Sequence, residues 1–82
     1  MSQDSRMKGF LEVLARAMVS HPDQVDVSVH DGRRATRFEI RVPAEDRGQL
    51  IGKEGMTVRS IRTLAAISAH RNRRRFEIEI PG

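Results

Sequence analysis

The stretch QLIGKEGMTV, residues 49–58, contains the feature on which the interpretation of the whole chain depends. Apolar residues with helical spacing lie on both sides of it, and Gly52 and Gly55 lie between them. Two glycines this close together end one element and let another molecule approach the backbone. The stretch therefore predicts two helices joined by a short loop, with Lys53 and Glu54 at the tip.

The loop has the properties of an anion site. A helix that begins near Met56 presents unpaired backbone N–H groups and a partial positive charge, and such ends attract anions. Lys53 adds a flexible cation at the tip. An ATP-binding P-loop is excluded, because only three residues separate Gly48 from Gly52 and because Glu54 stands where Ser or Thr would hold magnesium. Phosphate of another kind is the expected ligand.

The flanking sequence predicts an α+β fold in the order α-β-β-α-α-β. Residues 5–19 have the pattern of an amphipathic helix, and three runs near 25–30, 37–42 and 75–80 alternate as strands do. A short helix is expected to open with Pro43-Ala44-Glu45-Asp46 and to close at Gly52, and a longer one is expected from Met56 onward. Asp31-Gly32 is expected to form the turn that joins the first two strands in an antiparallel hairpin. We expect a three-stranded sheet with the helices on one face and paired Arg and Glu side chains on the other. The residues of the first helix that we expect to be buried are Phe10, Val13, Leu14, Ala17 and Met18. The phenylalanines expected in the core are Phe10, Phe38 and Phe76.

Length and composition narrow the class of protein. The 82 residues predict one domain over 1–82, and the absence of cysteine excludes a disulfide framework and a Cys-based zinc site. No stretch is long and apolar enough for a membrane span, and residues 1–4 do not begin a signal peptide, so we expect a cytoplasmic protein without membrane contacts.

Charge points to a polyanionic partner. The net charge is +4, and 13 of the 15 basic residues are arginine, which suits forked contacts with phosphate. Residues 52–75 hold seven basic residues against Glu54 alone. The run RNRRR, residues 71–75, is on its own equally typical of a solvated turn, and its location next to the glycine loop favours a role in binding.

Catalysis has little support in the sequence. His21, His30 and His70 are scattered without metal-ligand spacing and are expected at the surface or at caps. Glu45 and Asp46 are adjacent at a helix start, where they complement the helix dipole and do not form a catalytic pair. We therefore predict no enzymatic activity, no cofactor and no metal.

A family resemblance rests on the same residues. Ile51-Gly52-Lys53-Glu54-Gly55, followed by Val58 and Ile61, resembles the I-G-x-x-G-x-x-I-x-x-I core of KH domains, whose GxxG loop clamps about four nucleotides of single-stranded backbone. The helix and strand that precede the core (about 36–80) make the order similar to type II KH domains. The centre PAED-x-G-x-LIGKEG and the continuation R-x-I-R-T-L extend the similarity to small bacterial stand-alone KH proteins of the KhpA type.

The resemblance implies a set of binding residues and a function. Gly52 and Gly55 would admit the nucleic-acid backbone. Lys53 and the first amides of the helix that begins near Met56 would contact phosphate, and Ile51 with Val58 would support the groove. The implied function is a non-catalytic RNA chaperone or post-transcriptional regulator that binds single-stranded RNA or single-stranded DNA. Selectivity should be modest, because the chain has no Tyr or Trp. The residues expected at the RNA are Ile51, Gly52, Lys53, Glu54, Gly55, Met56, Val58, Arg59 and Arg62.

A second hypothesis is a protein-interaction module, in which Gly52-x-x-Gly55 is only a turn between helices. Ala65, Ala66 and Ala69 are small enough to admit a partner helix. The resemblance also implies a homodimer, or a heterodimer with a larger KH protein of the KhpB (Jag) type. The two hypotheses are compatible, because two linked grooves bind more tightly than one.

Overall fold

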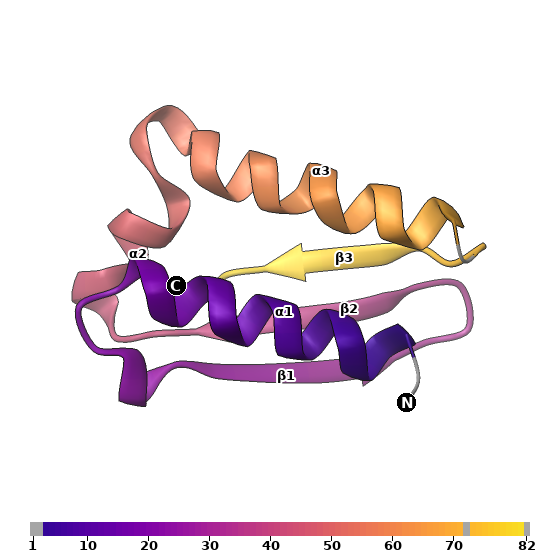
Figure 1. The fold of residues 1–82 in the computed structure, drawn as a ribbon, viewed down its shortest axis with the longest axis horizontal. Coiled ribbons are helices and arrows are strands. Elements are labelled where there is room, and N and C mark those ends of the chain that lie inside the picture. The colour runs from indigo at the N-terminus through magenta and orange to yellow at the C-terminus, as the bar shows by residue number, and fades with distance from the viewer. Residues whose placement is uncertain (1–2, 72, 82) are drawn as a thin grey trace.

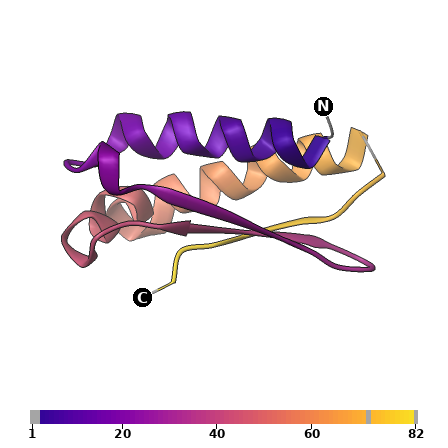
Figure 2. The same ribbon diagram turned by 90° about the horizontal axis from the view of Figure 1, so that it is seen from below.

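The computed structural model describes residues 3–71 and 73–81 and has the predicted order of helices and strands. Helices α1 and α3 lie over one face of the sheet, and the other face is open (Figure 1, Figure 2). Two short 3₁₀ turns, η1 and η2, were not predicted as elements. Asn72, within the RNRRR run, lies outside the described residues. The elements are α1 (Gln3–Met18), η1 (Pro22–Gln24), β1 (Asp26–Asp31), β2 (Thr36–Arg41), α2 (Ala44–Ile51), η2 (Lys53–Gly55), α3 (Met56–Arg71) and β3 (Phe76–Glu79).

The sheet has the strand order β1-β2-β3. β1 and β2 form the predicted antiparallel hairpin, with Val29 opposite Phe38. β3 pairs in parallel with β2, from Thr36 opposite Phe76 to Glu39 opposite Glu79. Parallel strands need a crossover, which here consists of α2 and α3. As a result, β3 is an edge strand that runs beside α3 (Figure 1).

The core lies between the sheet and the helices. α1 buries Met7, Leu11 and Ala15, which are spaced four residues apart, against Phe38 and Ile40 of β2. The ring of Phe76 meets that of Phe38 edge to face, with centroids 5.2 Å apart.

The expected buried face of α1 was partly wrong. Phe10 is 42% exposed and Val13 is 69% exposed, and Ala17 is also exposed, whereas Leu14 and Met18 are partly buried as expected. The reason is geometric: the stripe through Met7, Leu11 and Ala15 faces the sheet, so residues one position away from it turn towards its flank. Phe10 is therefore not a core residue.

The outer face of the sheet carries the predicted pairs of Arg and Glu. Glu39 is only 8% exposed and contacts Arg41 at 2.9 Å and Arg37 at 3.4 Å, while Arg37 reaches Glu79 on β3 at 3.6 Å. The hydrogen bond from Arg41 lowers the pKa of the Glu39 carboxyl below its usual value. This face is therefore a charged surface whose groups are largely paired.

The packing of α1 can be tested with two neighbouring substitutions. Leu11→Ala should lower the free energy of unfolding by about 2–5 kcal/mol, because it leaves a cavity in the core. Phe10→Ala should cost much less, because the ring is already partly in water. Urea unfolding measures both. An equal cost for the two variants would contradict the orientation of α1 described above.

Candidate nucleic-acid interface

The chain reverses direction between α2 and α3 through a turn with a left-handed backbone. The N–H of Gly52 donates to the carbonyl O of Gly48 at 2.9 Å and closes α2. The φ angles are +81° at Gly52, +56° at Glu54 and +72° at Gly55. α3 then begins at Met56. The predicted arrangement of helix, glycine loop and helix is confirmed.

The two glycines are required for different reasons. Gly52 has φ 81° and ψ 170°, a region that only glycine populates, and a Cβ there would lie 2.9 Å from the backbone N of Thr57. Gly55 needs glycine for its positive φ alone, since a Cβ there would meet nothing within 4 Å. The sequence-based interpretation gave both glycines the same role in admitting a ligand. In the structure the space at Gly52 is filled by Thr57, and the open side of the turn is at Gly55.

The backbone amides of the turn divide into two groups. The N–H of Gly55 donates to the carbonyl O of Gly52 at 3.1 Å, and the N–H of Met56 donates to the carbonyl O of Lys53. The first two amides of a 3₁₀ turn have no acceptor within it, and here these belong to Lys53 and Glu54. Both side chains are exposed. The amides and the Lys53 ammonium group thus form the anion-attracting end of the turn.

Most of the predicted site residues cluster at this turn. Met56 is 61% exposed and Arg59 is exposed on the first turn of α3, whereas Val58 is buried and Ile51 is half-buried beneath the turn. Arg62 is different. Its Nε and Nη2 both donate to the carbonyl O of Ile78 on β3, each at 3.2 Å. Arg62 therefore lies against the edge strand and covers part of its free backbone.

A hollow of about 510 Å³ lies between α3 and the edge strand β3. Arg62, Ala66 and Arg75 line it together with Phe76, Ile78 and the two carboxylates of β3. Among the predicted site residues only Arg62 contributes to it. Sequence reasoning missed the others because nothing in the pattern indicated that β3 pairs with β2 and lies at the edge. The sequence feature that could have indicated this hollow was Ala66, a small residue on the exposed side of α3.

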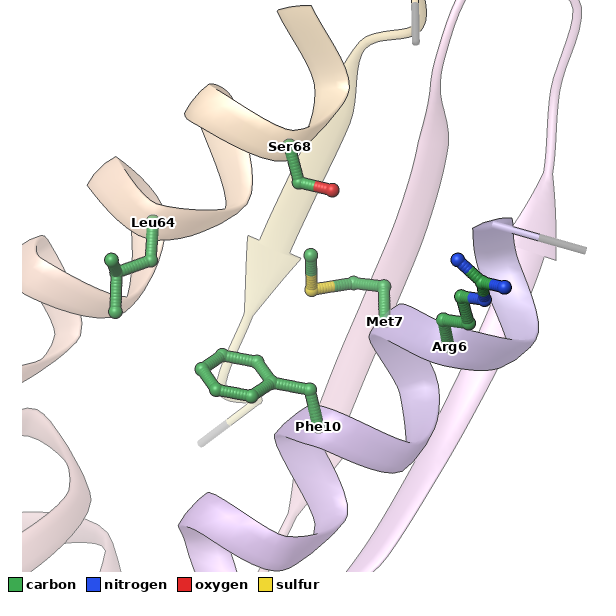
Figure 3. Close-up of a pocket in the computed structure, with 5 residues that line it drawn as sticks. All are labelled: Arg6, Met7, Phe10, Leu64 and Ser68. Carbon is green, nitrogen blue, oxygen red and sulfur yellow. The ribbon is translucent and has the colours of Figure 1, made fainter. Parts of the chain in front are cut away.

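A second hollow, of about 330 Å³, lies between α1 and α3 and is lined by Arg6, Met7, Phe10, Leu64 and Ser68. Phe10 and Leu64 point towards one another across it (Figure 3). Leu64 is 50% exposed. The space between the two long helices is therefore an apolar surface open to solvent.

The alanines of α3 do not form an open face for a partner helix. Ala65 and Ala69 are 1% and 3% exposed and pack inside the protein, and only Ala66 is exposed. The expectation that all three would admit a partner was wrong, because two of them are buried.

The arginine run also lies elsewhere than expected. Arg71 and residues 73–75 lie at the carboxyl end of α3, and the glycine turn lies at its amino end (Figure 1). A helix of 16 residues separates them by about 24 Å, at about 1.5 Å per residue. Nearness along the chain was misleading, because the intervening residues form one straight helix.

An ionic contact ties the start of α2 to the end of α1. Asp46 is 1% exposed and accepts hydrogen bonds from the backbone N–H groups of Ser20 at 3.3 Å and His21 at 3.1 Å. His21 Nδ1 lies 2.9 Å from Asp46 Oδ2, and His21 Nε2 lies 3.6 Å from Glu45 Oε1. The dipole alone therefore does not explain these carboxylates, and His21 is held by both of them.

The contact shifts the pKa values of both His21 and Asp46. The hydrogen bond with Asp46 raises the pKa of His21 above its usual value, and the charges of Asp46, Glu45 and Asp23 act in the same direction. Burial raises the pKa of Asp46, but the hydrogen bonds from His21 and Ser20 outweigh it, so the pKa of Asp46 lies below its usual value. The contact is thus strongest when imidazolium faces carboxylate.

The fold and the turn together define a KH domain of type II, with α1 and β1 preceding a core of β2, α2, the GxxG turn, α3 and β3. The family described as KhpA/KhpB, KH domain, matches residues 8–80, and the chain belongs to this family.

Relatives agree with this assignment. The chain is 38% identical to the RNA-binding protein KhpA of Halalkalibacterium halodurans, covering 90% of this chain and 97% of the relative. It is 38% identical to the protein of the same name from Clostridium acetobutylicum, covering 90% of this chain and 99% of the relative. It is 40% identical to the protein of that name from Treponema pallidum, covering 82% of this chain and 84% of the relative. These are names of binding proteins and not of enzymes, in agreement with the expectation of a non-catalytic chain. No solved structure has significant similarity to the chain.

Two absences apply to residues 3–71 and 73–81. No helix in these ranges has the length and apolar character needed to cross a membrane. Within the same ranges, no group of three or more His, Cys, Asp or Glu side chains could hold a metal ion.

The pKa shifts predict how stability depends on pH. The pKa of His21 is raised from 6.5, so its contribution is complete below pH 6.5 and is lost as the pH rises through the raised value. The pKa of Asp46 is lowered from 3.8, so its contribution is present above pH 3.8 and is lost as the pH falls through the lowered value. The Tm advantage of the wild type over His21→Asn should therefore shrink as the pH rises above 6.5 and through the raised pKa of His21. A difference in Tm that is constant over this rise in pH would contradict the ionic contact.

The unequal roles of the glycines give a second prediction. Gly55→Ala should lower the free energy of unfolding by about 1–2 kcal/mol, the cost of a left-handed backbone with a Cβ. Gly52→Ala should cost more, because the new Cβ also collides with the backbone of Thr57. Urea unfolding at one pH measures both. The explanation fails if Gly55→Ala is the more damaging change.

Proposed function

We propose that this protein binds single-stranded RNA without catalysing a reaction, as an RNA chaperone or post-transcriptional regulator in the cytoplasm. The turn Gly52–Gly55 holds the phosphate backbone, and the hollow between α3 and β3 receives the bases. The binding residues are those expected from the sequence, joined by the side chains that line the hollow. The KH core of about residues 36–80 would carry this function within a single domain.

One observation carries the proposal: the turn exposes the Lys53 side chain, the amides of Lys53 and Glu54 have no acceptor within the 3₁₀ turn that leads into α3, and Gly55 leaves the surface of the turn open. A phosphate group there would meet backbone donors, a partial positive charge and a cation together. Arg59 lies one turn further along α3 and is also exposed. Glu54 is the one acidic side chain at the tip, so it should reduce nonspecific attraction to polyanions.

The hollow beside β3 supports the binding of bases. Ala66, Phe76 and Ile78 give it apolar atoms, and the edge strand has backbone groups without a neighbouring strand. Arg62 donates to Ile78 with two of its groups and keeps further donors, because a guanidinium carries five N–H bonds. A strand of RNA on the turn would thus have bases next to this hollow.

The preference for RNA follows the names of the relatives. Sequence selectivity should be modest. Phe76 is partly buried against Phe38 and the exposed Phe10 lies on α1, so no aromatic ring stands free beside the turn in the described part of the chain. Stacking on aromatic rings, the strongest source of base affinity in other single-strand binders, is then a minor term.

A second candidate function is association with another KH protein, either a second copy of this chain or a larger partner of the KhpB (Jag) type. The observation that favours it is the apolar surface between α1 and α3. Phe10 and Leu64 are 42% and 50% exposed there. Association through this surface would leave the turn free and would join two RNA grooves, which raises affinity through effective concentration.

The turn can be tested with the double variant Lys53→Asp, Glu54→Asp. Aspartate tolerates a left-handed backbone, so the turn should stay folded while the cation is replaced by an anion. Binding of a fluorescent single-stranded RNA should fall by at least about tenfold, because phosphate contacts dominate such affinities. Fluorescence anisotropy over a salt series measures it, with circular dichroism as the check of folding.

The matched control is Lys8→Asp, Glu12→Asp on α1, which changes the same residue types and the same net charge. It should bind nearly as well as the wild type. If both double variants lose binding equally, the effect is one of net charge. If neither loses binding while Leu64→Glu abolishes self-association, the interaction module is the better account.

A further inference from the structure

The end of the molecule opposite the glycine turn carries a second concentration of arginine. There the connection between β1 and β2 lies beside the connection between α3 and β3 (Figure 1, Figure 2). The N–H of Thr36 donates to the carbonyl O of Arg75 at 2.8 Å, and Arg74 bonds both Asp31 and Thr36. These contacts fix the two connections together. The exposed arginines at this end other than Arg74, here called the distal arginine cluster, are Arg33, Arg34, Arg71, Arg73 and Arg75.

Two acidic groups at this end are paired with Arg74 and not with the other arginines. Arg74 contacts Asp31 at 2.9 Å and Asp4 at 3.5 Å. None of the arginines of the distal cluster forms an ion pair with another residue in the described ranges 3–71 and 73–81. The cluster is therefore an exposed surface of uncompensated positive charge.

The needs of the fold account for only part of the cluster. Arg71, in the last turn of α3, complements the helix dipole. Arg73 runs against local preference. Its φ is +55°, and its N–H donates to the carbonyl O of His70 at 3.2 Å. These two features mark the left-handed position that follows the end of a helix, where Gly or Asn is the usual residue. An exposed arginine kept in that conformation suggests a role outside the fold.

The hollow beside β3 connects the turn with the cluster. Arg62, on the second turn of α3, and Arg75, which belongs to the distal arginine cluster, both line it. α3 runs alongside from the glycine turn to the cluster (Figure 1). A strand bound at the turn and lying in the hollow would therefore be directed towards the cluster.

We propose that the distal arginine cluster binds the phosphate backbone of the same RNA strand where it leaves the hollow. This inference rests on the proposed function of the glycine turn. Arginine suits the task because its planar fork matches phosphate oxygens and its charge is permanent. The binding site of this protein is then longer than the about four nucleotides that a GxxG clamp holds.

The test compares two oligouridines, one of about four nucleotides and one of about twelve. Arg33→Gln, Arg34→Gln should weaken binding of the longer RNA and leave the shorter one unchanged. For single strands the slope of log K against log salt changes by about 0.7 per phosphate contact, so loss of two contacts should flatten the slope for the longer RNA by up to about 1.4. Fluorescence anisotropy of the full chain measures both.

The control Lys8→Gln, Arg16→Gln removes the same charge from α1 and should leave both affinities nearly unchanged. Equal weakening by both double variants, or equal weakening of both RNAs, would overturn the proposal. If the wild type binds the short RNA and no variant affects the longer one, the distal cluster fails and the turn remains. If the wild type binds neither RNA, the proposed function fails first and the cluster with it.

Arg73→Asn separates a binding role from a structural one. Asparagine fits the left-handed conformation better than arginine, so the variant should have a Tm equal to or above that of the wild type. Its affinity for the longer RNA should nonetheless fall. A folding defect cannot produce this combination. Unchanged affinity for the longer RNA would remove Arg73 from the proposed site.

Discussion

β2 and β3 pair in parallel, from Thr36 opposite Phe76 to Glu39 opposite Glu79, and parallel strands cannot be joined by a tight hairpin. The chain must return from one end of the sheet to the other, and it does so through α2, the glycine turn and α3. This return fixes the turn at one end of α3, puts α3 beside the edge strand and creates the hollow between them. The arginine run is carried to the opposite end for the same reason. The positions of the turn, the hollow and the distal cluster all follow from one pairing of strands.

The turn is built from backbone conformations that disfavour side chains. Gly52 occupies a glycine-only region and also has Thr57 where its Cβ would be. Glu54 adopts a left-handed conformation that costs about 1–2 kcal/mol for a residue with a Cβ. Strain of this kind persists where the surroundings impose it. Here α2 is held at its start by the contact of Asp46 with His21, and α3 is held by its buried face. The fixed helices hold the turn in place, with Lys53 and Glu54 exposed at its tip.

Much of the fold could be predicted because its signals are local. Alternation identified the strands, the two glycines identified the turn, and the order α-β-β-α-α-β followed. The rest depended on contacts between distant residues. The alternation in residues 75–80 does not reveal that they pair in parallel with β2, so the hollow lined by Ala66 and Phe76 was not predicted. The predicted buried face of α1 included Phe10, whereas the structure buries the neighbouring Leu11. The role of Asp46 could not be predicted, because its partner His21 is 25 residues away in the sequence. Of the site, the turn could be predicted and the surfaces that continue from it could not.

We expect RNA to lie on the glycine turn and along the side of α3 that faces β3. Titration of the isotope-labelled protein with a single-stranded RNA, followed by amide chemical shifts in NMR spectra, tests this claim most directly. The largest shifts are expected at Lys53, Glu54 and Gly55, with further shifts at Arg62 and along β3. Shifts confined to α1 and to the paired charges on the outer face of the sheet, with the turn unaffected, would contradict it.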